Sequence, residues 1–407
     1  MSENKWDAVI VGGGPSGMMA GIVAGSRKRK ILLLEKGKEL GRKLLATGNG
    51  RCNLTNEQMG PEHYHGGNRE LFKAILGRFD GKAARRFFKE VGLETKVEER
   101  GRVFPACNEA RAVRDLLAAE LERAGVAVRL HSEVMGIKLQ KEGIIVEQRG
   151  EVHLAQHVLL TTGGLTGPQF GASPAGLEIA RTLGHTILPT SPVLVPLELE
   201  SRWQKQLQGV RMDLEARAMM GDRVLFHDTD ELLFTPYGIS GPLGIQVSPV
   251  ALEHFQKKGF RLEISFFPGL RTEDVEEEIS RRWAQHPERE AGFSFTGWLP
   301  ARIAPVVLHS VGVDEHRTVK TIKPDERRRL PEAFTHWELV VKGGRSYKEA
   351  DAMAGGVETK EVNPQTLESR IMPRLFFAGE ILDVVGDWGG YNLQWAWSSG
   401  YVAGNAL

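Results

Sequence analysis

Residues 8–17 read AVIVGGGPSG, so an apolar run ends in Gly12, Gly14 and Gly17. A second apolar run, residues 31–34, ends at Glu35. A strand that turns into a helix beside a pyrophosphate needs glycine at the bend, at the phosphate and where helix and strand touch. Pro15 suits the first turn of such a helix, because its missing N–H needs no partner there. The stretch therefore predicts a strand, a glycine turn and a helix that together bind a dinucleotide.

The parts of this unit have separate expected roles. The helix directs its free N–H groups and the positive end of its dipole at the phosphates. Glu35, with Lys36, is expected at the adenosine end, because a carboxylate accepts hydrogen bonds from a ribose diol and repels a 2′-phosphate. The residues expected to hold the pyrophosphate through their backbone are Gly12, Gly14, Pro15, Ser16 and Gly17.

Composition excludes several classes of protein. The chain has 407 residues, which is room for two or three domains, and 53 basic against 52 acidic residues give a formal net charge of +1. No overall field would recruit nucleic acid or an anionic membrane, so we expect neither partner. The apolar runs are too short to cross a bilayer and the first residues lack a signal peptide, which favours the cytoplasm. The two cysteines are too far apart in the sequence to suggest a redox dithiol. The histidines are scattered and form no motif of metal ligands, so no metal is expected.

The periodicity of the first half predicts alternating elements. Residues 109–125 form an amphipathic helix that ends at Gly125. Residues 126–131, 134–150 and 157–164 read as strands, the second containing a hairpin turn at residues 142–143. The order strand, helix, strand, hairpin, strand is typical of an FAD-binding domain of the glutathione-reductase type. The predicted fold class is therefore α/β, with a Rossmann-like FAD-binding domain.

From about Ser191 the pattern changes to short apolar stretches separated by proline and glycine, which favours a compact, barrel-like β-domain. Residues 272–285 and 298–309 read as helices. From Arg374 a strand, a glycine turn and a final helix are better suited to complete the N-terminal sheet than to form a separate domain. The predicted division is residues 1–190 and 341–407 for a discontinuous FAD-binding domain, 191–270 and 326–340 for the β-domain, and 271–325 for a helical insert.

Several long motifs resemble one known family. They are GRKLLATGNGRCNLTN, TTGG with PAGLEIARTLGHT, LLFTPYGISGP, GGVETKEVNPQTLESR and LFFAGEILDVVGDWGGYNLQWAWSSGYVAG. Together they resemble the microbial FAD-dependent oxidoreductases related to aminoacetone oxidase and to a bile-acid dienone reductase, and the likeness covers essentially the whole chain. Pro236 stands where that family usually has a histidine, so no role of that histidine is carried over.

The resemblance implies further FAD contacts. Arg42 and Lys43 would neutralise phosphate charge, and Val134 matches the position whose backbone reads adenine. Glu380 matches an acid that binds flavin hydroxyls, with Asp383 as the competing candidate. The remaining implied contacts are Thr47, Gly48, Asn49, Gly50, Arg51, Cys52 and Asn53 on the loop beside the isoalloxazine, Thr162, Gly163 and Gly164 on the following turn, and Gly379, Gly389, Gly390, Tyr391, Asn392 and Leu393 around the last helix. A helix N-terminus there would stabilise reduced flavin.

Catalysis needs little from the protein, because flavin N5 itself exchanges hydride. Tyr391 is the candidate proton donor. No second glycine fingerprint follows a strand, so NAD(P)H or oxygen must reach the flavin without a separate nicotinamide domain. The favoured function is an FAD-dependent oxidoreductase acting on a small organic molecule, an amine or an enone. Two alternatives remain open: a flavin-dependent RNA-modifying or RNA-binding protein, using the basic runs 27–30 and 323–329, and a flavoprotein whose FAD has no turnover.

Overall fold

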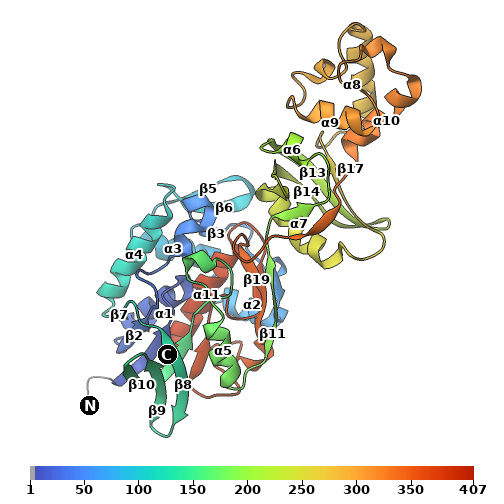
Figure 1. Cartoon of the computed structure of the whole chain (residues 1–407). Helices are drawn as coiled ribbons and strands as arrows, with labels where there is room; N and C mark the ends of the chain where they lie inside the picture. Colours follow the sequence, from blue (N-terminus) through green and yellow to red (C-terminus); the bar gives the residue numbers. More distant parts are fainter. Residues whose placement is uncertain (1–4) are drawn as a thin grey trace. The chain divides into compact units, whose positions relative to one another are not determined.

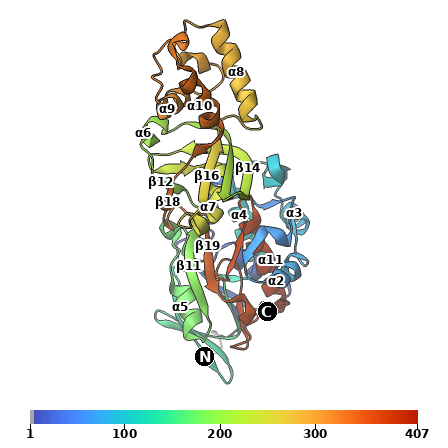
Figure 2. The same cartoon turned by 90° about the vertical axis from the view of Figure 1, so that its right-hand side faces the viewer.

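A computed structural model describes residues 5–407, which form two compact units. The first unit ends at Pro192 and resumes at Tyr347–Leu407, and the second comprises Val193–Ser346. Figures 1 and 2 show the chain from two sides, coloured along the sequence.

The first unit is built on a sheet in which β7, β2, β1 and β10 follow one another in parallel. On the far side of β10, β20 pairs in parallel with its C-terminal half, and the β8–β9 hairpin is antiparallel to its N-terminal half. The bounds are β1 (Lys5–Val11), β2 (Ile31–Leu34), β7 (Ala127–Arg129), β8 (Val134–Gln140), β9 (Gly143–Gln148), β10 (Glu151–Leu160) and β20 (Leu375–Phe377). Pairing of β20 with β10 confirms that the last segment completes the N-terminal sheet, and the α/β fold class is confirmed.

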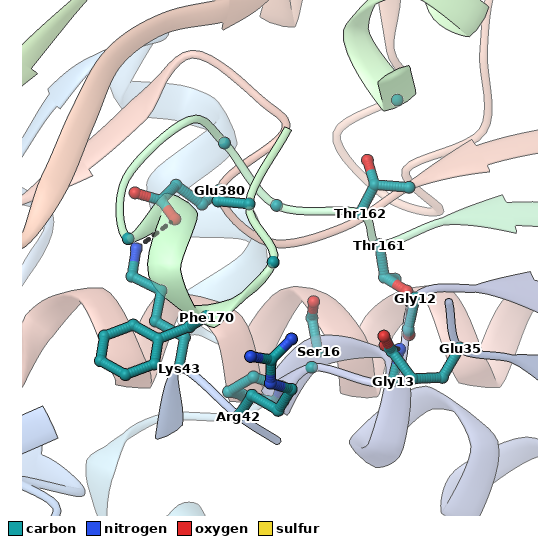
Figure 3. Close-up of a pocket in the computed structure, with 18 of the residues that line it drawn as sticks. Gly12, Gly13, Ser16, Glu35, Arg42, Lys43, Thr161, Thr162, Phe170 and Glu380 are labelled. Carbon is teal, nitrogen blue, oxygen red and sulfur yellow. Dashed lines mark hydrogen bonds and ion pairs between the residues drawn. The ribbon is translucent and has the colours of Figure 1, made fainter. Parts of the chain in front are cut away.

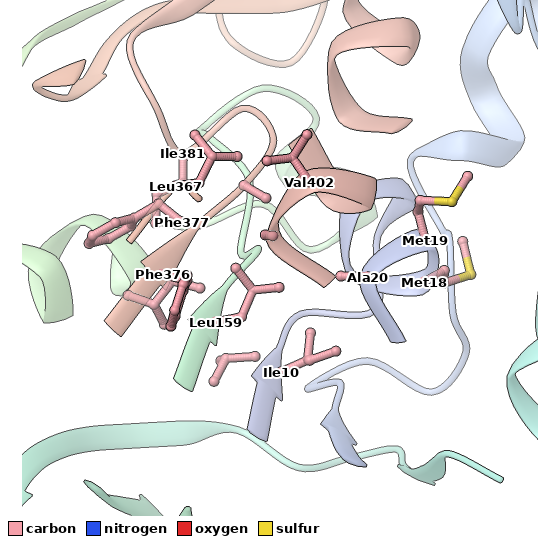
Figure 4. Close-up of a cluster of buried hydrophobic side chains, with 14 of the residues drawn as sticks. Ile10, Met18, Met19, Ala20, Leu159, Leu367, Phe376, Phe377, Ile381 and Val402 are labelled. Atoms are coloured by element: carbon pink, nitrogen blue, oxygen red, sulfur yellow. The ribbon is translucent and has the colours of Figure 1, made fainter. Parts of the chain in front are cut away.

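Central parallel strands are covered on both faces, so they carry continuous apolar runs rather than alternating ones. All four residues of β2 are buried, as are the last four of β1. The helices of this unit are α1 (Pro15–Ser26), α2 (Arg69–Leu76), α3 (Gly81–Glu90), α4 (Ala110–Arg123), α5 (Ala175–Thr182) and α11 (Tyr391–Ala406). Side chains of β1, β10, β20, α1 and α11 share one core (Figure 4).

Helix α11 packs directly on α1 (Figure 1). A Cβ atom on Gly400 would lie 2.4 Å from the carbonyl oxygen of Ser16, and one on Gly404 would lie 2.6 Å from that of Ala20. The two helix backbones therefore approach more closely than any side chain would permit. The first and the last helix of the chain form one rigid pair.

Three small sheets complete the first unit. Strands β3, β6 and β5 form one of them, β4 pairs with β21, and β11 pairs with β19. Their bounds are β3 (Thr55–Asn56), β4 (Tyr64–Gly66), β5 (Thr95–Val97), β6 (Arg102–Pro105), β11 (Ile187–Val193), β19 (Ala352–Val357) and β21 (Val384–Gly386).

A buried polar network ties the end of α5 to the segment before β20. His185 Nδ1 lies 3.1 Å from a Glu361 carboxylate oxygen, and its Nε2 lies 2.9 Å from the Ser369 hydroxyl. That hydroxyl also accepts hydrogen bonds from the N–H groups of Ile371 and Met372. His185 and Ser369 are buried. Because the serine oxygen already accepts two backbone hydrogen bonds in the interior, the arrangement is structural despite its likeness to a hydrolase triad.

Replacement of His185 by alanine is expected to lower the free energy of unfolding by about 3 kcal/mol, because it removes the hydrogen bonds to Glu361 and Ser369 and leaves a cavity in the interior. Burial lowers the pKa of His185, so the unfolded chain binds its proton more readily than the folded chain does. This histidine therefore costs no stability above the unfolded pKa of 6.5, and stability falls as the pH drops below it. Denaturant titrations across that range should show a shallower pH dependence in the variant. Equal destabilisation by His286→Ala, at an exposed histidine, would contradict the assignment.

The second unit contains an antiparallel sheet in the order β17, β16, β13, β14, β15, β12 and β18. Its strands are β12 (Leu197–Leu199), β13 (Arg211–Met220), β14 (Arg223–Phe234), β15 (Gly238–Ser240), β16 (Phe260–Ser265), β17 (Trp337–Glu338) and β18 (Val341–Gly344). Its helices are α6 (Gln204–Leu207), α7 (Gly241–His254), α8 (Thr272–Gln285), α9 (Ile303–Ser310) and α10 (Pro324–Thr335).

Some predictions for this unit were wrong. Residues 341–346 belong to it and not to the FAD-binding domain, because β18 pairs with β12. Residues 326–335 are helical, in α10, and the second predicted helix begins only at Ile303. Helix α7 was missed because prolines suggested short strands, although Pro242 occupies the first turn and Pro249 is accommodated inside the helix. One core extends from the sheet to α8, α9 and α10, so a division into separate β and helical domains stays a prediction.

Within the described part of the chain, membrane-spanning helices are absent, since every helix is too short or too polar for that purpose.

Candidate functional site

The main cavity of the first unit opens where β1, β2 and β10 end, at the carboxyl edge of the sheet (Figure 3). Ligands of such sheets bind at this edge. Among the predicted FAD contacts, those that line the cavity are Gly12, Gly14, Pro15, Ser16, Glu35, Lys36, Arg42, Lys43, Thr47, Val134, Thr162, Gly163, Gly164, Glu380, Asn392 and Leu393. Residues from the first, middle and last thirds of the chain thus meet at one site.

The three fingerprint glycines meet three different requirements. Gly12 has a φ of +110°, and a Cβ there would lie 2.5 Å from the carbonyl oxygen of Thr161. A Cβ on Gly17 would lie 2.0 Å from the carbonyl oxygen of Gly12, so this glycine permits contact between helix and strand. A Cβ on Gly14 would meet no atom within 4 Å. The open space at Gly14 faces the N-terminus of α1, where an anionic group would find free N–H donors.

Glu35 fixes the turn and also lines the cavity. Its two carboxylate oxygens accept hydrogen bonds from the N–H groups of Gly13, at 2.7 Å, and Gly37, at 2.6 Å. A carboxylate has about four lone-pair positions, so acceptor capacity remains for a ligand hydroxyl. The labelled side chain stands beside Gly12 and Gly13 in Figure 3.

Lys43 and Glu380 connect the loop after β2 to the turn after β20. The lysine Nζ lies 2.7 Å from one carboxylate oxygen, shown by the dashed line in Figure 3. The hydroxyl of Thr166 contacts both: it donates to the other oxygen of Glu380 at 2.8 Å and accepts from Lys43. The N–H of Met353 donates to the same carboxylate at 3.1 Å. Lys43 and Glu380 therefore neutralise each other, and Arg42, whose guanidinium donates to the carbonyl of Gln169, adds a cation.

The other predicted contacts lie outside the cavity lining. They are Gly17, Gly48, Asn49, Gly50, Arg51, Cys52, Asn53, Gly379, Asp383, Gly389, Gly390 and Tyr391. Arg51 is directed away, toward Glu98 and Asn108, and stacks on Phe104. Asp383 accepts a hydrogen bond from the N–H of Gly355 and so holds β19. Their roles toward a cofactor stay predictions.

Two of these residues have chemical states relevant to catalysis. The Cys52 side chain is fully buried, and burial raises the pKa of its thiol to about 12, so no thiolate forms near neutral pH. Tyr391 is 4% exposed, and its hydroxyl donates to the carbonyl of Gln58 at 3.2 Å. Burial also raises the pKa of Tyr391 to about 12. The tyrosine is protonated, but its proton already has a partner.

Sequence reasoning missed several residues of this region. Thr161 donates its hydroxyl to the carbonyls of Val11 and Gly12, which holds the glycine turn, and Thr166 joins Lys43 to Glu380. The doubled threonines before Gly163 could have signalled the first. No local signal marks His63, His65 and Asp387, which the fold brings together across more than 300 positions.

The sequence predicted no set of metal ligands, but the described residues contain one candidate group. A turn at Gly312 brings together His309, Asp314 and Glu315, whose candidate ligand atoms all lie within 4.8 Å of one another. The spacing is no familiar metal motif, which is why it escaped the sequence analysis. Two of the three residues are exposed.

The chain was compared with known proteins. Residues 6–406 match the family described as the HI0933-like protein Rossmann domain. The chain belongs to the HI0933-like family. A 3-dehydro-bile acid delta(4,6)-reductase of Clostridium scindens is 35% identical over 98% of both chains. A ribosomal RNA dihydrouridine synthase of Escherichia coli is 32% identical, over 99% of this chain and 98% of the relative.

Solved structures show the same fold as this HI0933-like chain. A 3-ketosteroid-delta4-(5alpha)-dehydrogenase from Rhodococcus jostii aligns with a TM-score of 0.54 and 16% identity, over 99% of this chain and 97% of that one. The resemblance drawn from the motifs is confirmed. By family and fold, the chain is an FAD-dependent oxidoreductase.

Proposed function

We propose that the chain binds FAD in the cavity of the first unit and reduces a carbon–carbon double bond conjugated to a carbonyl group, with NAD(P)H as the source of electrons. The observation that carries the proposal is the glycine turn, whose only unobstructed position, Gly14, faces the start of α1. The substrate class is taken from what the sequence relatives are named for.

The residues present fit FAD. The start of α1 offers amide donors to a pyrophosphate, and the carboxylate of Glu35 offers acceptors to a ribose. The hydroxyl of Thr162, which lines the cavity, is buried without a hydrogen-bond partner, and buried polar atoms of this kind are usually satisfied by a ligand or by water. The N-terminal turn of α11 contains no acidic residue that would oppose negative charge on a reduced ring.

The two relatives are named for reactions with a common step. A delta(4,6)-reductase of a 3-oxo compound and an enzyme that converts uridine to dihydrouridine each saturate a double bond conjugated to a carbonyl. Bound and reduced, FAD supplies the hydride through N5. The hydride adds to the carbon beta to the carbonyl, a proton adds to the alpha carbon, and NAD(P)H is oxidised in restoring the reduced cofactor. The protein must hold the substrate and provide that proton.

Anaerobic spectroscopy of the purified yellow protein tests the proposal. NADPH or NADH is expected to bleach the flavin absorbance, and cyclohexenone or a bile acid with a 3-oxo-4,6-diene should restore it. Bleaching by aminoacetone, with peroxide formed in air, would instead identify an amine oxidase. The proposal would be contradicted if neither NADPH nor NADH bleached the flavin absorbance and no enone reoxidised the reduced protein.

A second candidate, reduction of uridine in RNA, is favoured by the identity with the Escherichia coli relative. The basic runs give it less support. In and beside the second run, Arg328 pairs with Asp325, Glu326 pairs with Arg317 outside the run, and Arg327 stacks on Trp283. Such pairing leaves little positive charge for phosphates. Reoxidation of the reduced protein by unmodified ribosomal RNA, and not by small enones, would establish this alternative.

A further inference from the structure

A histidine–aspartate–histidine cluster lies at the turn before α11. His63 Nδ1 is 2.9 Å from one oxygen of Asp387, and His65 Nε2 is 2.7 Å from the other. The β4–β21 ribbon creates this arrangement, since His65 faces Val385 in its register and the N–H of Asp387 donates to the carbonyl of His63. The His63 ring stacks on Tyr391, with ring centres 4.4 Å apart.

The cluster shares its turn with the cavity wall. Asn392, which lines the cavity, accepts a hydrogen bond from the N–H of Gly386 and donates to its carbonyl, both at 2.8 Å. Val384 of β21 also lines the cavity. Two residues, Val385 and Gly386, therefore separate the cavity wall at Val384 from Asp387, whose carboxylate contacts both imidazoles.

The groups around His63 favour it as a proton carrier. Asp387 orients the ring through Nδ1, so Nε2 is the ring nitrogen that can face a substrate. Although burial alone would raise it, hydrogen bonds from His65 and His63 hold the pKa of Asp387 below its usual value. Nε2 of His63 also lies 4.0 Å from an oxygen of Glu62, a second carboxylate beside the ring. Tyr391, which stacks on the ring, stays protonated because burial raises its pKa to about 12, and its hydroxyl donates a hydrogen bond to the carbonyl of Gln58.

The side chains differ in accessibility. His63 retains 28% of its surface, whereas His65 retains 62% and Asp387 42%. His63 is thus partly enclosed and held by stacking and a carboxylate, while His65 stands on the open side. A residue that carries protons for chemistry in a cavity is expected to be held in this way.

We propose that His63, positioned by Asp387 and Tyr391, is the acid that protonates the alpha carbon of the substrate through Nε2. This inference rests on the proposed function. In the step, hydride adds to the beta carbon, the C=C π bond breaks, and the N–H bond of the imidazolium breaks as the alpha C–H bond forms. His63 is left neutral and recovers its proton from solvent.

The test separates the two half-reactions in the holoenzyme. Wild type and His63→Asn are reduced anaerobically with NADPH, and reoxidation by cyclohexenone is followed in a stopped-flow instrument. Reduction is expected to proceed at the same rate in both, while reoxidation slows by about 100-fold or more in the variant. Reoxidation is also measured across a pH series in both proteins, and any pH dependence of the wild-type rate that comes from His63 should be absent from the variant.

His286→Asn is the control, because it removes an exposed imidazole outside the cluster, and its reoxidation rate should stay close to wild type. As a readout independent of turnover, imidazole ¹⁵N spectra should show a hydrogen-bonded Nδ1–H for His63 that disappears in Asp387→Asn. Equal reoxidation rates and pH profiles in wild type and His63→Asn would overturn the inference while leaving the proposed function intact. A wild-type protein that no enone reoxidises would instead refute the proposed function.

Discussion

Replacement of Gly14 by alanine is expected to remove FAD from the purified protein while leaving the fold unchanged. The backbone of Gly14 has a φ of −78° and a ψ of −176°, which alanine adopts without strain, and its Cβ would contact no protein atom within 4 Å. The added methyl group therefore acts only on a ligand at the start of α1. Loss of one charge-assisted hydrogen bond and of close approach should weaken FAD by about 100-fold.

Flavin content after desalting and titration of the apoprotein with FAD measure this effect. Gly343→Ala is the matched control, because Gly343 lies in β18 of the other unit and its Cβ would also meet no atom within 4 Å. We expect both variants to have the thermal stability of the wild-type apoprotein. Full flavin content in Gly14→Ala would show that the FAD phosphates do not bind at the start of α1.

Replacement of Gly400 by alanine should destabilise the first unit, in contrast to the usual effect of this change. Alanine in the middle of a helix is normally about 1 kcal/mol more favourable than glycine. Here the new Cβ would lie 2.4 Å from the carbonyl oxygen of Ser16, so α1 and α11 must move apart. Overpacking costs about 1–3 kcal/mol, and so short a contact with backbone is expected to cost the upper value, which leaves a net loss of about 2 kcal/mol after the gain in propensity.

Urea unfolding of the apoprotein measures that loss. The same substitution at Gly404, whose Cβ would lie 2.6 Å from the carbonyl oxygen of Ala20, should act in the same direction. Because Ser16 also lines the cavity, flavin affinity should decrease together with stability. An increase in the unfolding free energy of either variant would show that the helices are not in backbone contact.

Local patterns predicted the parts of the fold that local physics determines. The glycine turn, Glu35 and the hairpin at residues 142–143 follow from short stretches whose backbone requirements are specific. The pairing of the last segment with the N-terminal sheet could be predicted, because an isolated strand such as β20 must pair with a sheet. Helix α7 was less visible, since the prolines inside it are typical of turns.

Positions that depend on distant contacts could not be predicted. The implied contacts on the loop from Gly48 to Asn53 share one motif, yet Arg51 is directed away by Glu98, which belongs to another segment. Tyr391 was chosen as proton donor by its place in a motif, whereas its hydrogen bond to Gln58 depends on the folded loop. His63 and Asp387 are 324 residues apart and meet only through a two-strand ribbon.

The pairing of β20 with β10 and of α11 with α1 has a consequence during synthesis. The flavin unit cannot close until residues 375–406 have left the ribosome, because they supply its last strand and the helix against α1. At about 5–20 residues per second, more than 360 residues separate the emergence of α1 from that of α11, a delay of about 20–70 s. During this interval the apolar flank of α1 lacks its partner α11, and the vitamin-derived cofactor can be loaded only after residues 375–406 have emerged.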